Sequence, residues 1–324
     1  MRLPRFPFHR AKPAETALGV EIAGDRAAWV RLRRNGNHIS LEAHGSTALA
    51  SSDSGSTLAS AFDSSNREAP CVLVLEREDY LLVPMQTPDV PEKDLRDALL
   101  WQVKPKLDFP IHEAVLDIVD FPATKNQPER RVYVAVGNGS RLQRKVDWLH
   151  GVDLKLRAID VPELVMRNLI SRLPEQTDRG VILLALQEQE SYIVLCRNDN
   201  LYLARNIPIG YKRLHRVYGE HESTGEVDSL PDEASVLLDR MALEIQRTAD
   251  FYDGNYSHDA TVAFYATPAL TLLPGALEFF RANLGLQPRV LDLNDLFPGE
   301  EKFVPDEQMV YLRAAGAALR QFLI

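Results

Sequence analysis

The feature that most constrains this chain is a pattern of short strands that occurs twice, half a chain apart. From Leu18 the runs LGVEI, AAWVRLRR and HISLEAH are strand-like, and Asn35-Gly36 between the last two is a strong signal for a tight hairpin. A second set, VILLAL, SYIVLCR and LYLARNIPIG, begins at Val181, and the offset of 163 from position 18 to position 181 aligns both sets without a gap. The superimposed pairs are Trp29 with Tyr192, Val30 with Ile193, Leu32 with Leu195, Arg34 with Arg197, and Asn35 with Asn198. We therefore predict two related α/β lobes, each opening with a three-strand meander.

Length and composition fit two soluble lobes and exclude several classes of protein. At 324 residues the chain is long enough for two domains. Its formal net charge of −9 argues against a general nucleic-acid binder. The two cysteines, Cys71 and Cys196, lie in separate apolar runs, so we expect neither a disulfide framework nor a metal cluster. No apolar run is long enough to cross a membrane and no signal peptide precedes the first strand, so we expect a cytoplasmic protein.

Local patterns predict where three helices of the first half begin. Apolar residues with a period of 3.6 predict an amphipathic helix over 91–107, with Asp89 before it as the cap. A second helix, over 140–150, is expected to start at Ser140. Asp160 and Glu163 have the spacing of a capping box, which predicts a helix that opens there and runs to about residue 172.

Three other segments have a distinctive composition. The first residues are rich in proline and basic side chains, and we expect 1–17 to be a flexible basic tail. Residues 219–235 are acidic with few apolar side chains, which predicts an exposed loop before a helix over 232–253. The last predicted helix, over 305–322, contains small residues at 314–318, which would let its backbone lie close to a neighbouring element.

The common catalytic and metal-binding motifs are missing. The sequence has no P-loop and no Gly-x-Ser-x-Gly elbow, and the turn at 137–140 lacks the last glycine of the dinucleotide-binding fingerprint. His112-Glu113 is not followed by a second histidine at the metalloprotease spacing. We interpret His215 and His221 as exposed side chains, and we predict neither a catalytic residue nor a metal site.

Seven blocks of sequence, in order, resemble one family. They are LGVEIAG (18–24), VPEKDLRDALLWQVKPKLDFPIHEAVLDIVDF (90–121), AIDVPEL (158–164), RNIPIG (205–210), EIQRTADFY (244–252), LLPG (272–275) and YLRAAGAALR (311–320). Two lobes that each open with a meander are typical of the actin/Hsp70/sugar-kinase superfamily, and the blocks resemble its PilM-like proteins of type IV pilus assembly. Within that family, the branch that serves the mannose-sensitive haemagglutinin (MSHA) pilus gives the closest fit.

The resemblance implies an α/β, actin-like fold with a PilM/FtsA-type subdomain inserted in lobe one. The expected division is lobe one over 18–176 with its inserted subdomain at about 78–150, lobe two over 177–304 with a helical and acidic-loop part at about 211–258, and a C-terminal helix over 305–324 that packs back on lobe one.

The resemblance also implies partners. PilM-like proteins dock on the N-terminal cytoplasmic tail of a PilN-like bitopic inner-membrane protein, in a groove beside the inserted subdomain, and link it to the assembly ATPase. This places the protein at the inner membrane of a Gram-negative bacterium, in contact with the membrane only indirectly and without nucleic acid. Trp101, Lys104 and Phe109 are the predicted contact residues, with a core position as the equal alternative for Trp101.

The resemblance further implies a nucleotide site, whose expected elements are degraded here. The first phosphate hairpin retains Glu21, Gly24 and Asp25, but Ala28 stands where the family has a lysine. The second hairpin, at 185–187, lacks its carboxylate and is followed by Gln and Glu side chains. The adenosine turn, normally glycines, falls at 266–268 and contains a proline. We therefore expect no cofactor, with ATP and Mg²⁺ bound only if the vestigial site still functions.

Two alternatives remain open from the sequence. One is an active actin-like ATPase or small-molecule kinase, in which Asp160 is the candidate to position the attacking group. The other is a GspL-like component of type II secretion, which shares the fold. Such components usually continue into a membrane helix, whereas this sequence ends at Ile324, so we expect a docking protein instead.

Overall fold

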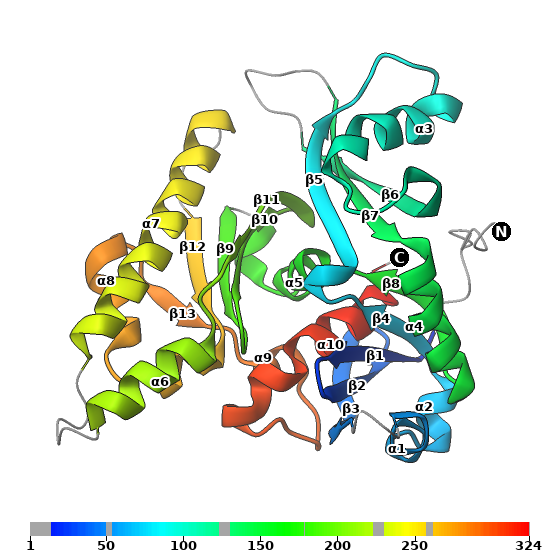
Figure 1. Ribbon diagram of the computed structural model, residues 1–324. Coiled ribbons are helices and arrows are strands. Elements are labelled where there is room, and N and C mark those ends of the chain that lie inside the picture. The colour runs from blue at the N-terminus through cyan, green and yellow to red at the C-terminus, as the bar shows by residue number, and fades with distance from the viewer. Residues whose placement is uncertain are drawn as a thin grey trace.

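Two five-stranded sheets of the same design form the body of the protein (Figure 1). The computed structural model describes residues 14–49, 54–122, 130–177, 179–222, 230–256 and 262–323. The first sheet has the strand order β3-β2-β1-β4-β8 and the second β11-β10-β9-β12-β13. In each, an antiparallel meander is extended by two parallel strands. The bounds are β1 Thr16–Ala23, β2 Arg26–Asn35, β3 His38–Ala48, β4 Pro70–Val74, β8 Lys155–Asp160, β9 Gly180–Leu186, β10 Ser191–Arg197, β11 Asn200–Ile207, β12 Val262–Ala266 and β13 Pro288–Val290.

Both predicted meanders are confirmed, and they differ in the length of their first turn. Residues 24 and 25 connect β1 to β2, whereas residues 187–190 connect β9 to β10. The first turn is tight because Gly24 adopts a φ of +56°, which residues with a side chain rarely adopt. The strand order is the same in the two sheets, so the repeat includes the two parallel strands as well as the meanders.

A third, smaller sheet with the order β5-β7-β6 projects from the first lobe. Its elements are β5 Tyr80–Gln86, β6 Ala114–Phe121, β7 Arg131–Asn138 and the helix α3 Glu92–Val103. Leu95, Leu99 and Val103 of α3 are buried against Val132, Val134 and Val136 of β7. These residues form a hydrophobic core separate from the main one.

The helix α10, Gln308–Arg320, packs so closely on β1 that glycine is required at the contacts. A Cβ atom at Gly19 would lie 1.8 Å from the carbonyl oxygen of Ala314, and one at Gly316 would lie 2.3 Å from that of Val165. Val165 belongs to α5, Pro162–Ile170, which packs on the other side of α10. The close approach predicted from the small residues at 314–318 is therefore confirmed.

Three predicted helix caps are wrong. α4, Gly139–Gly151, is capped by Asn138, whose side chain accepts from the N–H of Arg141 at 3.0 Å, and not by Ser140. Asp160 is not the cap of α5, because it ends β8 and its Oδ2 pairs with Arg320 at 2.9 Å. α3 begins after Pro91, and the residue predicted to cap it, Asp89, makes no cap.

The remaining helices surround the two sheets (Figure 1). They are α1 Ser54–Ala61, α2 Ser64–Glu68, α6 Tyr211–Glu222, α7 Asp232–Asn255, α8 Ala276–Leu284 and α9 Leu293–Leu296. α6 and α7 shorten the predicted acidic loop at both ends, and residues 223–229 lie outside the described part. Of the predicted tail, residues 1–13 also lie outside it, while Ala17 is fully buried in β1. Within the described ranges, no helix is both long and apolar enough to cross a membrane.

Candidate functional site

The first turns of the two meanders are joined by an ion pair. Arg26, which follows the first turn, has its Nη2 3.2 Å from Oε2 of Glu188 in the second turn. The other carboxylate oxygen of Glu188 is 2.5 Å from Nζ of Lys212 in α6. The hydrogen bond from Lys212, with the charge of Arg26, lowers the pKa of Glu188. Two turns that lie 162 positions apart in sequence are thus linked through one carboxylate.

The backbone N–H of the first turn is also occupied. Gly24 donates its N–H to Oε1 of Glu76 at 2.9 Å. Glu76 is itself paired with Nζ of Lys145 at 3.0 Å, and the same ammonium lies 2.8 Å from Oδ2 of Asp79. The side chain of Asp25 is exposed and takes no part in this network.

Beneath the turns, a carboxylate and a guanidinium are buried together. Glu21 of β1 pairs with Arg313 of α10, and both side chains are largely removed from solvent. Burial raises the pKa of Glu21, while the charge of Arg313 acts in the opposite direction. In the second lobe, the hydroxyl of Tyr192 donates to Glu190, which also accepts from Asn206. The cluster therefore places charges from both lobes around α10.

The ends of β8, an edge strand, and of β12, an inner strand, complete the site. Asp160, at the end of β8, is 3% exposed and is neutralised by Arg320. The segment after β12 is closed, because Thr267 is fully buried and its hydroxyl accepts from the N–H of Leu186 at 3.0 Å. Pro268 follows and has no N–H to offer a ligand. Glu21, Asp160 and Glu188 are therefore paired with the protein's own cations. Asp25 is exposed instead.

A buried hydrogen bond ties the small sheet to the body, and no sequence motif indicated it. The hydroxyl of Tyr80, the first residue of β5, donates to Oε2 of Glu163 in α5 at 2.6 Å. Burial raises the pKa of Glu163, and the hydrogen bond from Tyr80 opposes the shift. The partners lie 83 positions apart, so only the fold brings them together.

Of the three predicted partner-binding residues, two lie together on the surface. The side chain of Trp101 is 63% exposed at the end of α3, which excludes the core position considered for it. Nζ of Lys104 lies 4.9 Å from the centre of the indole ring. Phe109 is half-buried and packs against the small core instead.

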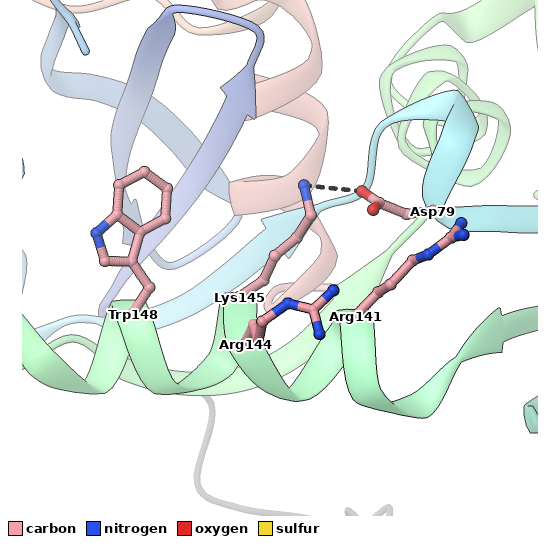
Figure 2. Close-up of a pocket in the computed structure, with 5 residues that line it drawn as sticks. All are labelled: Asp79, Arg141, Arg144, Lys145 and Trp148. Carbon is pink, nitrogen blue, oxygen red and sulfur yellow. Dashed lines mark ion pairs between the residues drawn. The ribbon is translucent and has the colours of Figure 1, made fainter. Parts of the chain in front are cut away.

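An open concavity of about 370 Å³ lies between the helical turn Arg77–Asp79 and α4. It is lined by Asp79, Arg141, Arg144, Lys145 and Trp148. Figure 2 shows four of these side chains on one face of α4, with Lys145 directed at Asp79. This site was not predicted from the sequence, although three basic residues and a tryptophan at helical spacing indicate it.

Nothing in the described part of the chain resembles a metal centre, since no group of three or more His, Cys, Asp or Glu side chains converges there. The sequence matches no family model and none of the curated proteins. The structure is similar to one solved as the PilM-PilN type IV pilus biogenesis complex, with a TM-score of 0.70 and 21% identity over 96% of this chain and 99% of that one. The chain has the actin-like fold of PilM.

Two further solved structures are less similar. One is the cytoplasmic domain of EpsL, an inner membrane component of the type II secretion system of Vibrio cholerae, with a TM-score of 0.48 and 12% identity over 92% of this chain and 94% of that one. The other is the ethanolamine utilization protein EutJ from Carboxydothermus hydrogenoformans, with a TM-score of 0.46 and 12% identity over 95% and 90%. The fold class predicted from the resemblance is confirmed, with the small third sheet inserted between β4 and β8.

Proposed function

We propose that this protein is a non-catalytic, actin-like adaptor of a type IV pilus assembly machine. It docks on the cytoplasmic tail of a PilN-like inner-membrane protein and links that protein to the assembly ATPase. The observation that carries the non-catalytic part is the ion pair between Arg26 and Glu188, which joins the two turns expected to hold phosphates. Similarity in fold to PilM over 96% of the chain supports the part that concerns the pilus.

The turns are chemically unsuited to a nucleotide. A triphosphate needs free N–H groups and a Mg²⁺ ion held by carboxylates. Here the N–H of Gly24 already donates to Glu76. In the second turn, Glu188 is paired with Arg26 and Lys212, so these cations are not free to hold a phosphate. Glu21, the carboxylate of the vestigial first hairpin, is neutralised by Arg313. These contacts hold the two turns in place without a bound ligand.

The exposed pair of Trp101 and Lys104 is the proposed contact for the tail. Large aromatic side chains dominate binding energy when a partner covers them, and a tryptophan left 63% exposed is available for that role. Phe109 supports this surface from the small core beneath it. We assign the machine to the MSHA type, with MshI as the corresponding component, on the order and spacing of the seven sequence blocks. The protein would then act at the cytoplasmic face of the inner membrane.

Binding of the tail tests the docking surface. A fluorescent peptide with the sequence of the N-terminal tail of the PilN-like partner should bind the full chain. Trp101→Ala should weaken this binding by about tenfold or more. Val236→Ala, which removes an exposed apolar side chain from α7, is the matched control and should bind like the wild type. Absence of binding by the wild type, or equal binding by Trp101→Ala, would contradict the proposed surface.

Calorimetry with Mg·ATP tests the non-catalytic assignment separately. We expect no heat of binding at micromolar nucleotide and no phosphate release, because the turns are held by their own ion pairs. Submicromolar binding with turnover would establish the alternative, an active ATPase of the same fold. This result would leave the docking of the tail untouched, so the two parts of the proposal can fail independently.

A further inference from the structure

The concavity on α4 has unbalanced positive charge. Of its three cations, Lys145 is neutralised by Glu76 and Asp79. Arg141 makes a single long contact, 3.4 Å from Nη1 to the carbonyl oxygen of Glu78. Arg144 is exposed and has no hydrogen-bond or ion-pair partner among the residues that the structure describes. Two guanidinium groups are therefore available to a ligand on a protein whose net charge is −9.

The same concavity offers an apolar contact. Trp148 is half-buried and packs against the main core, and its ring lies beyond Lys145 on the face that carries the arginines (Figure 2). Residues three or four positions apart on a helix are neighbours, with Cβ atoms about 5–6 Å apart. Arg141, Arg144 and Trp148 thus form a row at regular intervals along one face of α4.

We propose that this row binds an acidic segment of a partner protein in extended conformation. In such a segment, side chains on one face recur every second residue, about 6.6 Å apart. This spacing is about 1 Å wider than that of the row on α4, a difference that the long arginine side chains can span, if the segment reads acidic-x-acidic-x-apolar. The two carboxylates pair with Arg141 and Arg144, for which planar bidentate contacts are the preferred geometry, and the apolar side chain covers Trp148.

The charge of the site separates this partner from the tail discussed above. Cytoplasmic segments next to a membrane helix are enriched in Lys and Arg, which the two free arginines repel. A flat membrane surface fits the site less well, because Trp148 is half-buried in a concavity that a planar surface does not enter. A peptide can enter the concavity, where Lys145 balances Asp79 and Glu76 and the two arginines remain for its carboxylates.

A labelled peptide of sequence SESESLS tests the proposal by fluorescence anisotropy with the full chain at low ionic strength. The peptide should bind, and the peptide SKSKSLS, with lysine in place of each glutamate, should not. Arg144→Glu should weaken binding by about tenfold or more, because a charge-assisted hydrogen bond is replaced by repulsion. Arg240→Glu is the matched control, since it makes the same charge change at an exposed position of α7 and should bind like the wild type.

Three results would overturn the proposal. The first is equal binding of the acidic peptide by Arg144→Glu and the wild type, and the second is equal binding of the lysine peptide. The third is co-sedimentation of the protein with vesicles containing phosphatidylglycerol, but not with phosphatidylcholine alone, while the peptide fails to bind. Thermal unfolding of each variant, expected to match the wild type because both arginines are exposed, excludes misfolding as the cause.

Discussion

The buried pair of Glu21 and Arg313 makes a quantitative prediction about stability. Arg313→Met leaves the carboxylate of Glu21, 4% exposed, without its cation. Removing one partner of a buried pair costs about 3–5 kcal/mol. For a chain of 324 residues that unfolds in one transition, this corresponds to a fall in Tm of about 4–7 °C. Burial already raises the pKa of Glu21 although the charge of Arg313 opposes the shift, so its pKa should rise further in the variant, and the loss of stability should grow as pH rises through the pKa that Glu21 has in the wild type.

Thermal unfolding followed by circular dichroism measures both effects. The double variant Glu21→Leu with Arg313→Met replaces the pair by apolar side chains and should recover to within about 1–2 kcal/mol of the wild type. Arg33→Met is the matched control, since its pair with Glu42 is half-exposed and should be worth less than about 1 kcal/mol. The reasoning is refuted if Arg313→Met is no worse than Arg33→Met, or if the double variant is as unstable as the single one.

Three further variants test other contacts. Glu163→Gln still accepts from Tyr80 but cannot ionise; since burial raises the pKa of Glu163, the wild type should lose stability as pH rises above 4.5, and this variant should show a flatter Tm between roughly pH 5 and 8. Gly19→Val forces a side chain into the backbone of α10 and should cost about 3 kcal/mol or more by urea unfolding, whereas Gly254→Ala, in open space, should not destabilise. Leu99→Ala should cost about 2–5 kcal/mol, and hydrogen exchange should locate the loss in β5–β7 and not in β1.

The parts of the fold that sequence predicted are those with local causes. The meanders follow from alternating apolar residues and from the Asn-Gly turn, both of which act between neighbours along the chain. The predicted helix caps were wrong where contacts with distant residues or the exact start of a helix decide the cap. Asp160 has the spacing of a capping residue, but Arg320, 160 positions later, takes its carboxylate. Near the start of α4, both Asn138 and Ser140 are residue types that can cap a helix; the helix begins at Gly139, so Asn138 is the cap.

In the candidate site, too, the features with local causes were predictable from the sequence and those that join distant segments were not. The degraded turns were recognisable because each is a short continuous segment, but the ion pair between Arg26 and Glu188 was not, because it joins segments from different lobes. Whether Trp101 faced the core or the solvent could not be decided from periodicity, since a helix of 12 residues with an apolar face has room for a tryptophan on either side. The packing of α3 on its sheet decides the question and leaves Trp101 exposed to solvent.

The position of α10 also affects how the protein is made. β1 is among the first segments to leave the ribosome, yet the face that carries Gly19 is covered by a helix that starts at Gln308, roughly 290 residues later. At translation rates of about 5–20 residues per second, that face waits about 15–60 s for its partner. The first lobe cannot finish folding during synthesis of its own sequence. One face of β1 therefore stays uncovered on the nascent chain until α10 has been synthesised.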